Sequence, residues 1–104
     1  MYDEFTQERI ANLRTQKDCS AREMSLSIGQ NPNYIGKIEN KKTLPSLPVL
    51  FYVCEFFGIT PQEFFDEGNR YPERLQEIIE DIRKLNDKDL ASLAGVVKAM
   101  VRNQ

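Results

Sequence analysis

The sequence predicts an all-α protein of seven helices, with one core among the first helices and two amphipathic helices after them. Three observations lead to this fold class. Between turn residues, apolar side chains recur every three or four positions, which is helical spacing, and no segment alternates as a strand does. Helix-start signals precede several of these segments, and glycine follows some of them. With 104 residues, the chain is long enough for one modest core.

The first two helices are separated by a short polar turn. We expect the first helix over about residues 4–17. Ser20 and Glu23 have the spacing of a capping box, in which the hydroxyl and the carboxylate each satisfy a free amide, so the second helix begins there. Gly29 can take the left-handed conformation that ends it. The side chains predicted to face the core are Ile10, Leu13, Met24 and Ile28.

The third helix follows after only a few residues. Because so short a connection cannot reverse the chain, the second and third helices must cross steeply, which presents the third helix to a partner. We expect Asn31 as its N-cap and Pro32 at its first position, where a missing N–H costs nothing. Ile35 and Ile38 face inward. The residues left on the outside are Asn33, Tyr34, Gly36 and Lys37.

Ser46 and Thr60 are the predicted N-caps of the fourth and fifth helices. The fourth helix is expected to run to Phe57 and to end at Gly58. In the short fifth helix, Glu63 completes a second capping box. The fourth helix carries a wide apolar stripe, so Cys54 within it is interpreted as a core side chain. This stripe consists of Leu47, Leu50, Val53, Cys54 and Phe57.

The stretch DEGNRYP marks a boundary, so we assign residues 1–68 to one domain and residues 69–104 to a C-terminal helical segment. Two amphipathic helices are expected in this segment, over about 72–85 and 87–102. Their apolar stripes either fold back on the first five helices or form a dimer interface, and we favour the dimer. The predicted dimerisation residues are Leu75, Ile78, Ile82, Leu90, Leu93, Val97 and Met100.

The composition argues against several classes of function. The chain has no histidine, and Cys19 and Cys54 are too far apart in the sequence to make a metal-binding pair. No glycine-rich phosphate loop is present. We therefore expect no enzyme activity, no metal and no cofactor. No apolar run could span a bilayer and no signal peptide is visible, which predicts a cytoplasmic protein with reduced thiols and no membrane partner.

Residues 10–66 carry an ordered pattern across the predicted bundle. It consists of Ile10, Leu13, Arg14, Ser20, Glu23, Met24, Ile28, Gly29, Ile35, Ile38, Glu39, Pro45, Ser46, Leu47, Leu50, Gly58 and Ile59. This set resembles the Cro/C1-type (XRE family) helix-turn-helix of bacterial and phage repressors. Its most telling part is YIGKIEN followed by LPSL. Each residue alone is weak evidence, whereas the ordered set is specific.

The resemblance implies a five-helix, lambda-repressor-like bundle whose third helix lies in the DNA major groove. Asn33 suits adenine and Lys37 suits the acceptors of guanine. Pro32 offers only shape or a thymine-methyl contact, and Tyr34 either reaches DNA or packs on the flank of the helix. The residues implied in base contact are Pro32, Asn33, Tyr34 and Lys37. Those implied in phosphate contact are Asn31, Asn40, Lys41 and Lys42.

The net charge of −2 requires any DNA-binding surface to be locally basic. Between Gly29 and Lys42 the lysines outnumber the single glutamate, Glu39. The resemblance pairs that glutamate with Arg14 as a structural ion pair. Removing one partner would cost about 3–5 kcal/mol if the pair is buried and far less if it is exposed.

Three positions depart from the family pattern. Ala21 stands where the family often has a glutamine that anchors phosphate. Ser25 replaces a small alanine between the second and third helices, which we expect to be a mild change. Lys41 occupies a position where the family favours glycine, so we expect a different bend there, with Asn40 in the left-handed conformation.

Two hypotheses of function follow. In the first, the protein is a sequence-specific transcriptional regulator, a repressor that binds double-stranded DNA as a homodimer at a palindromic operator. In the second, it is an interaction module or antitoxin-like protein that binds a protein partner through its acidic surface and apolar C-terminal helices. Ala21, Pro32 and a pI of about 5.2 favour the second. An antitoxin that represses its own operon would satisfy both.

Overall fold

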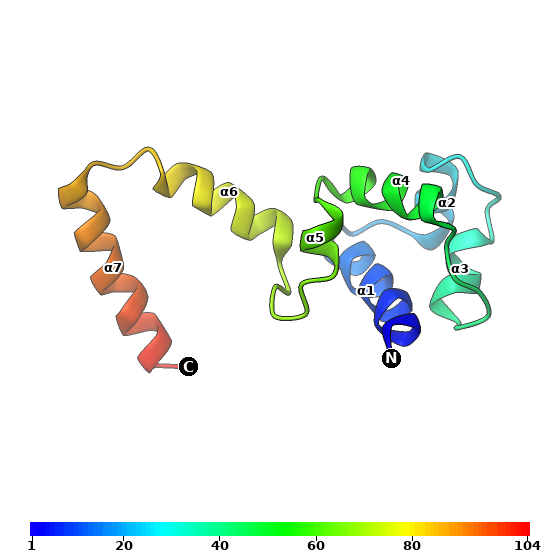
Figure 1. Ribbon diagram of the computed structural model, residues 1–104, viewed down its shortest axis with the longest axis horizontal. Helices are drawn as coiled ribbons and strands as arrows, with labels where there is room; N and C mark the ends of the chain where they lie inside the picture. Colours follow the sequence, from blue (N-terminus) through cyan, green and yellow to red (C-terminus); the bar gives the residue numbers. More distant parts are fainter. The chain divides into compact units, whose positions relative to one another are not determined.

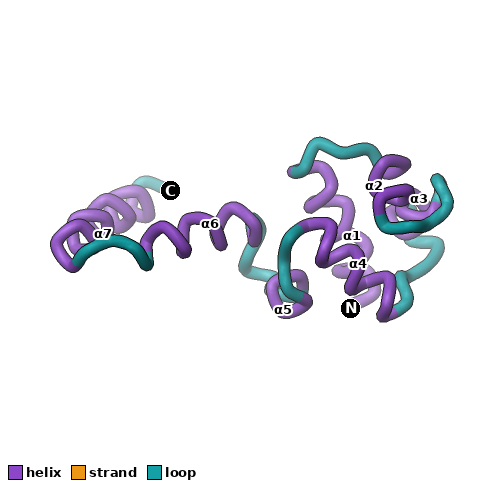
Figure 2. Tube along the Cα trace, turned by 90° about the horizontal axis from the view of Figure 1, so that it is seen from above, coloured by secondary structure: helices purple, strands orange, loops and turns teal.

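A computed structural model describes all 104 residues and contains only helices and their connections (Figure 2). The all-α prediction is therefore confirmed. The helices are α1 (Tyr2–Gln16), α2 (Ala21–Ser27), α3 (Tyr34–Glu39), α4 (Leu47–Phe57), α5 (Pro61–Phe64), α6 (Pro72–Ile82) and α7 (Asp87–Arg102). The chain divides into two compact units, Met1–Glu73 and Arg74–Gln104. The first contains α1–α5, and the second contains most of α6 and all of α7 (Figure 1).

The predicted helix starts of the bundle are largely confirmed. The hydroxyls of Ser20 and Thr60 each accept a hydrogen bond from the amide of the third helical residue. The glutamate carboxylate of each capping box accepts one from the backbone amide of the cap residue. Ser46 caps α4 through its hydroxyl, and Gly58 ends that helix with a φ of +68°. Three boundaries differ by two or more residues. α1 begins at Tyr2, two residues before the predicted start. α3 begins at Tyr34, two residues after the predicted start, and α6 ends at Ile82, short of residue 85.

The core of the first unit lies among all five of its helices. Its buried apolar side chains are Ile10, Leu13, Met24, Ile28, Ile35, Ile38, Leu50, Val53, Cys54, Phe57, Ile59 and Phe64. Burial raises the pKa of the Cys54 thiol, with the Glu55 charge adding to the effect, as expected for a core cysteine. The prediction that Leu47 belongs to the buried stripe of α4 is wrong. Leu47 is 63% exposed because it occupies the first position of the helix.

A buried arginine joins α1 to α5. The Arg9 guanidinium donates through Nε to the Phe64 carbonyl and through Nη2 to the Glu63 carbonyl, both at 2.8 Å. These carbonyls lie at the end of a helix, where they lack partners inside the helix. Arg9 therefore supplies the C-terminal cap of α5 from another helix. Desolvation lowers the pKa of Arg9, and the charge of Asp66 partly opposes this.

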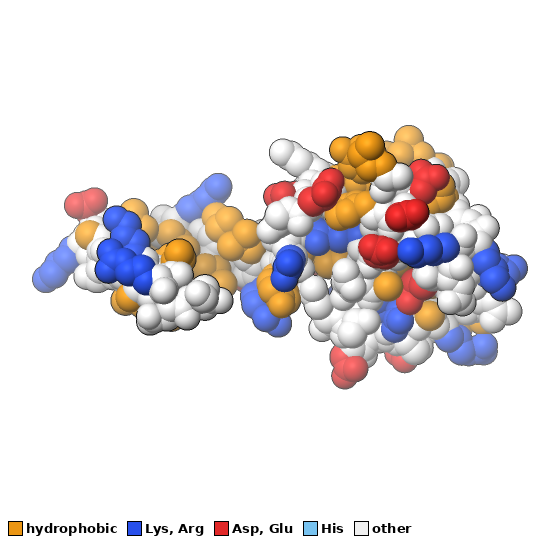
Figure 3. All heavy atoms as spheres, turned by 90° about the horizontal axis from the view of Figure 1, so that it is seen from below, with side chains coloured by type: hydrophobic (Ala, Val, Ile, Leu, Met, Phe, Trp, Pro, Cys, Tyr) orange, Lys and Arg blue, Asp and Glu red, His pale blue; other side chains and the backbone are white.

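The second unit has no buried side chain in α7. Leu75, Ile78, Leu90, Val97 and Met100 are exposed, whereas Ile82 and Leu93 are half-buried. Figure 3 shows apolar side chains at the surface of this unit. The seven residues predicted for dimerisation thus belong to amphipathic helices whose apolar faces are largely exposed in the single chain.

Candidate nucleic-acid interface

α2 and α3 are joined by a turn that starts at a left-handed glycine. Gly29 has a φ of +77°, which a glycine adopts without strain. The expectation that Asn31 caps α3 and that Pro32 is its first residue is wrong. The Oδ1 of Asn31 accepts the amide of Asn33 at 3.0 Å, so it closes a side-chain turn before the helix begins. Pro32 and Asn33 lie in that turn, and Asn33 is the N-cap residue.

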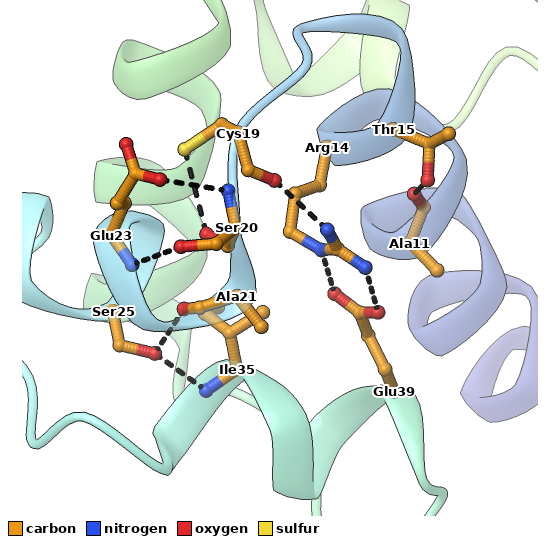
Figure 4. Close-up of polar contacts among 10 residues, drawn as sticks. All are labelled: Ala11, Arg14, Thr15, Cys19, Ser20, Ala21, Glu23, Ser25, Ile35 and Glu39. Atoms are coloured by element: carbon orange, nitrogen blue, oxygen red, sulfur yellow. Dashed lines mark hydrogen bonds and ion pairs between the residues drawn. The ribbon is translucent and has the colours of Figure 1, made fainter.

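The start of α3 is capped by α2. The Asn33 side chain makes no capping bond. The hydroxyl of Ser25, on α2, accepts the amide of Ile35 at 3.0 Å and donates to the Ala21 carbonyl at 2.7 Å (Figure 4). Ser25 is fully buried. The hydroxyl that replaces the expected alanine methyl therefore connects the two helices, and the interpretation of Ser25 as a mild change missed this connection.

The end of α3 is fastened to α1 by the ion pair between Arg14 and Glu39. Two guanidinium nitrogens donate to the two carboxylate oxygens, at 2.6 and 2.8 Å, and Nη1 donates to the Cys19 carbonyl at 2.8 Å (Figure 4). The side chains are 22% and 15% exposed. The bond to Glu39 raises the pKa of Arg14. This half-buried pair fixes the tilt of α3 from its C-terminal end.

The outer face of α3 borders a shallow hollow of about 350 Å³. Its lining residues are Ala21, Arg22, Pro32, Asn33, Gly36, Lys37 and Asn40. Asn33 and Lys37 are exposed, and the side-chain amide of Asn33 makes no capping hydrogen bond. A side-chain carbon at Gly36 would meet no neighbouring atom within 4 Å. No neighbouring side chain therefore requires a glycine in the middle of this helix.

Arg22 is the residue of this hollow that the sequence interpretation missed. It lies on the first turn of α2, next to Ala21, and it is exposed. Only the crossing of α2 and α3 brings it to the same hollow as Lys37. The only sign of Arg22 in the sequence was a basic residue inside the capping box of α2. That position does not indicate a place near α3 unless the crossing of α2 and α3 is known. Arg22 can supply a phosphate contact beside Ala21, where the glutamine of the family pattern is missing.

Tyr34 lies on the flank of α3. Its ring is half-buried and packs against the core cluster. Burial raises the pKa of its hydroxyl, and a hydrogen bond with the Ser46 backbone opposes this. Of the two interpretations of Tyr34, the structure favours packing against the bundle.

The loop after α3 carries the other predicted phosphate contacts. Asn40, Lys41 and Lys42 are all exposed, as is Asn31 at the opposite end of the helix. The expected left-handed conformation at Asn40 is wrong. Asn40 has a φ of −83°, and Lys41 itself takes the left-handed conformation with a φ of +62°. The Lys41 ammonium lies 3.0 Å from Glu8 of α1, a partner that sequence reasoning also missed.

Neither a metal site nor a membrane span is found in the structure. No group of three or more histidine, cysteine, aspartate or glutamate side chains is arranged to hold a metal ion. None of the helices is both long and apolar enough to cross a membrane.

Comparison with known proteins identifies the family. The family model described as helix-turn-helix, the Cro/C1-type or XRE family, matches residues 10–64, just over half of the chain. Neither the curated proteins nor the solved structures contain a significant match. The matched residues span the ion pair, the α2–α3 crossing and the exposed face of α3 described above. The chain belongs to the Cro/C1-type helix-turn-helix family of DNA-binding transcription regulators.

Proposed function

We propose that the protein is a repressor that binds a specific, twofold-symmetric DNA operator as a homodimer, each copy inserting α3 into the major groove of one half-site. The observation that supports this most is the exposed face of α3. Asn33 and Lys37 lie one turn apart beside the open backbone of Gly36. An amide suits adenine and an ammonium suits guanine, so the face carries two different base-reading groups.

Cations at the edges of this face support an approach to the DNA backbone. Arg22 lies on α2, while Lys41 and Lys42 follow α3, so basic groups occur both before and after the helix. Phosphate contacts of this kind fix the register of a protein on the duplex but read no sequence. We assign these roles to Arg22, Asn31, Asn40, Lys41 and Lys42.

The test is selection of bound duplexes from a randomised pool, followed by fluorescence anisotropy at fixed salt. We compare the wild type with Asn33→Ala, which keeps the charge, and Lys37→Ala. Each variant should lose preference at about one base pair per half-site, worth about 1–3 kcal/mol, and only Lys37→Ala should reduce the salt dependence. Selection of no sequence by the wild type, or unchanged preferences in both variants, would contradict recognition through α3.

The homodimer is proposed to form through α6 and α7. A single small module contacts too few phosphates for selective binding, and a second copy supplies the second half-site. The exposed apolar side chains of these helices support such a contact. Each would contribute about 1.5–3 kcal/mol if fully buried, and several together offset the cost of association.

Sedimentation of wild type, Val97→Glu and Ala99→Glu tests the dimer. Both substitutions add one carboxylate to an exposed position of α7, but residue 99 lies about 130° around the helix from the centre of the stripe formed by Leu90, Leu93 and Met100. We expect Val97→Glu to be monomeric and Ala99→Glu to remain dimeric. A monomeric wild type would instead support a different protein partner for this surface, which is the second hypothesis of function.

A further inference from the structure

The loop that follows α3 ends in a conformation that is unusual for a lysine. The amide of Lys41 donates to the Ile38 carbonyl at 3.0 Å, and the amide of Lys42 donates to the Lys37 carbonyl at 2.9 Å. These two bonds form a Schellman motif, whose left-handed position is usually glycine. Here that position is Lys41, with a φ of +62°. A side chain at this position is strained, so its presence calls for an explanation beyond the turn itself.

Two adjacent residues of α1 hold this loop. Nε2 of Gln7, which is buried, donates to the Thr43 carbonyl at 3.0 Å and so fixes the loop backbone. Oε1 of Glu8 accepts from the ammonium of Lys41, also at 3.0 Å. This contact with Glu8 raises the pKa of Lys41, and the more distant charge of Glu4 adds to it. α1 thus determines both the path of the loop and the place of its first ammonium group.

Lys41 differs in this respect from the other lysines of the interface. Lys37 and Lys42 form no ion pair. The Lys41 and Glu8 side chains are 50% and 60% exposed, so water and other anions can reach the pair. An exposed pair of this kind is weak, and a phosphate that carries a full negative charge can compete for the ammonium.

We propose that Glu8 competes with DNA for Lys41: it binds the ammonium in the free protein and must release it to a backbone phosphate in the complex. The inference rests on the proposed function. Glu8 is fixed on α1, so in the complex its carboxylate stays near the phosphate that replaces it and repels it within the Debye length. Glu8 therefore weakens binding to every sequence, and it limits nonspecific binding by a basic face on an otherwise acidic protein.

The experiment is a double-mutant cycle of Glu8→Gln and Lys41→Gln. Binding to a duplex of arbitrary sequence is measured by anisotropy at low, fixed ionic strength. Glu8→Gln should bind about 1.5- to 5-fold more tightly than the wild type, the range that corresponds to an exposed ion pair. The gain from Glu8→Gln should be smaller in the Lys41→Gln background. Glu55→Gln removes the same charge from α4, where no lysine contacts it, and should change the affinity less than Glu8→Gln.

The outcomes separate this inference from the function on which it rests. Unchanged or weaker binding by Glu8→Gln, or an equal gain with and without Lys41, would overturn the competition while DNA binding by the wild type stands. Absence of binding by a folded wild type to any duplex would refute the proposed function and the inference with it. Tighter binding that depends on Lys41 would support both.

Discussion

Replacing Ser25 by alanine should destabilise the first unit by about 1–2 kcal/mol, although alanine is the residue that the family resemblance leads one to expect there. The hydroxyl is the acceptor for the Ile35 amide at the start of α3. Ser25 and Ile35 are both fully buried, so water cannot take its place. A buried donor left without a partner costs about 1–3 kcal/mol. The better helix propensity of alanine returns at most about 0.5 kcal/mol.

Urea unfolding followed by tyrosine fluorescence measures this loss in the first unit alone, since all four tyrosines lie within residues 1–73. The protein concentration is kept constant because dimerisation would contribute to the apparent stability. Ser27→Ala is the matched control. Ser27 lies on the same helix, and its exposed hydroxyl bonds the Glu23 carbonyl at 2.8 Å but caps no other helix. We expect its effect to stay within about 0.5 kcal/mol.

Two results would refute this reasoning about α3. One is a Ser25→Ala variant that unfolds at the same urea concentration as the wild type. The other is an equal loss of stability in Ser27→Ala, which would show that the bond within α2 matters and the contact with α3 does not.

Three further substitutions test the interface and its support. Gly36→Ala should stabilise the bundle by about 0.5–1 kcal/mol in urea unfolding, because the added methyl meets only open space in the free protein. The same methyl should weaken DNA binding, because it lies on the face of α3 that is proposed to enter the groove. A less stable variant would contradict this. Arg22→Ala should reduce the slope of log affinity against log salt by about 1. Arg70 is an exposed arginine between α5 and α6 that does not line the hollow beside α3, so Arg70→Ala should leave the slope unchanged. Glu39→Gln should cost about 1.5–3 kcal/mol in the same unfolding assay, compared with little for the exposed Glu55→Gln, because Arg14 loses a charged partner; equal losses would indicate a general charge effect.

Local sequence signals predicted the elements of the bundle well because their causes are local. The capping boxes at Ser20 and Thr60 satisfy amides only three residues away. Gly29 and Gly58 meet a backbone requirement at their own positions. The spacing of Ile35 and Ile38 reports burial on one face of one helix. Each of these features can be judged without knowing where any other helix lies.

The features that sequence reasoning missed depend on contacts between helices. Ser25 caps α3 across the α2–α3 crossing, and Glu8 reaches Lys41 from α1. Arg22 shares a hollow with Lys37 only after α2 and α3 have packed. The error in the predicted start of α3 has a local cause. The Asn31 side chain accepts a hydrogen bond within the turn and does not cap the helix. A proline after asparagine is compatible with either arrangement, so the residue types alone could not decide between them.

The short length of α3 has a consequence for how the proposed recognition surface can be used. With six residues, α3 is well below the roughly 12–15 residues that an isolated helix needs in water. Its two ends are held by side chains of α1 and α2. The proposed recognition helix therefore cannot be transplanted as a peptide, because a fragment spanning it would be largely unstructured. If α3 binds DNA as proposed, the apparent affinity scales with the folded fraction of the bundle, so a core mutation that unfolds most of the bundle mimics the loss of a base contact.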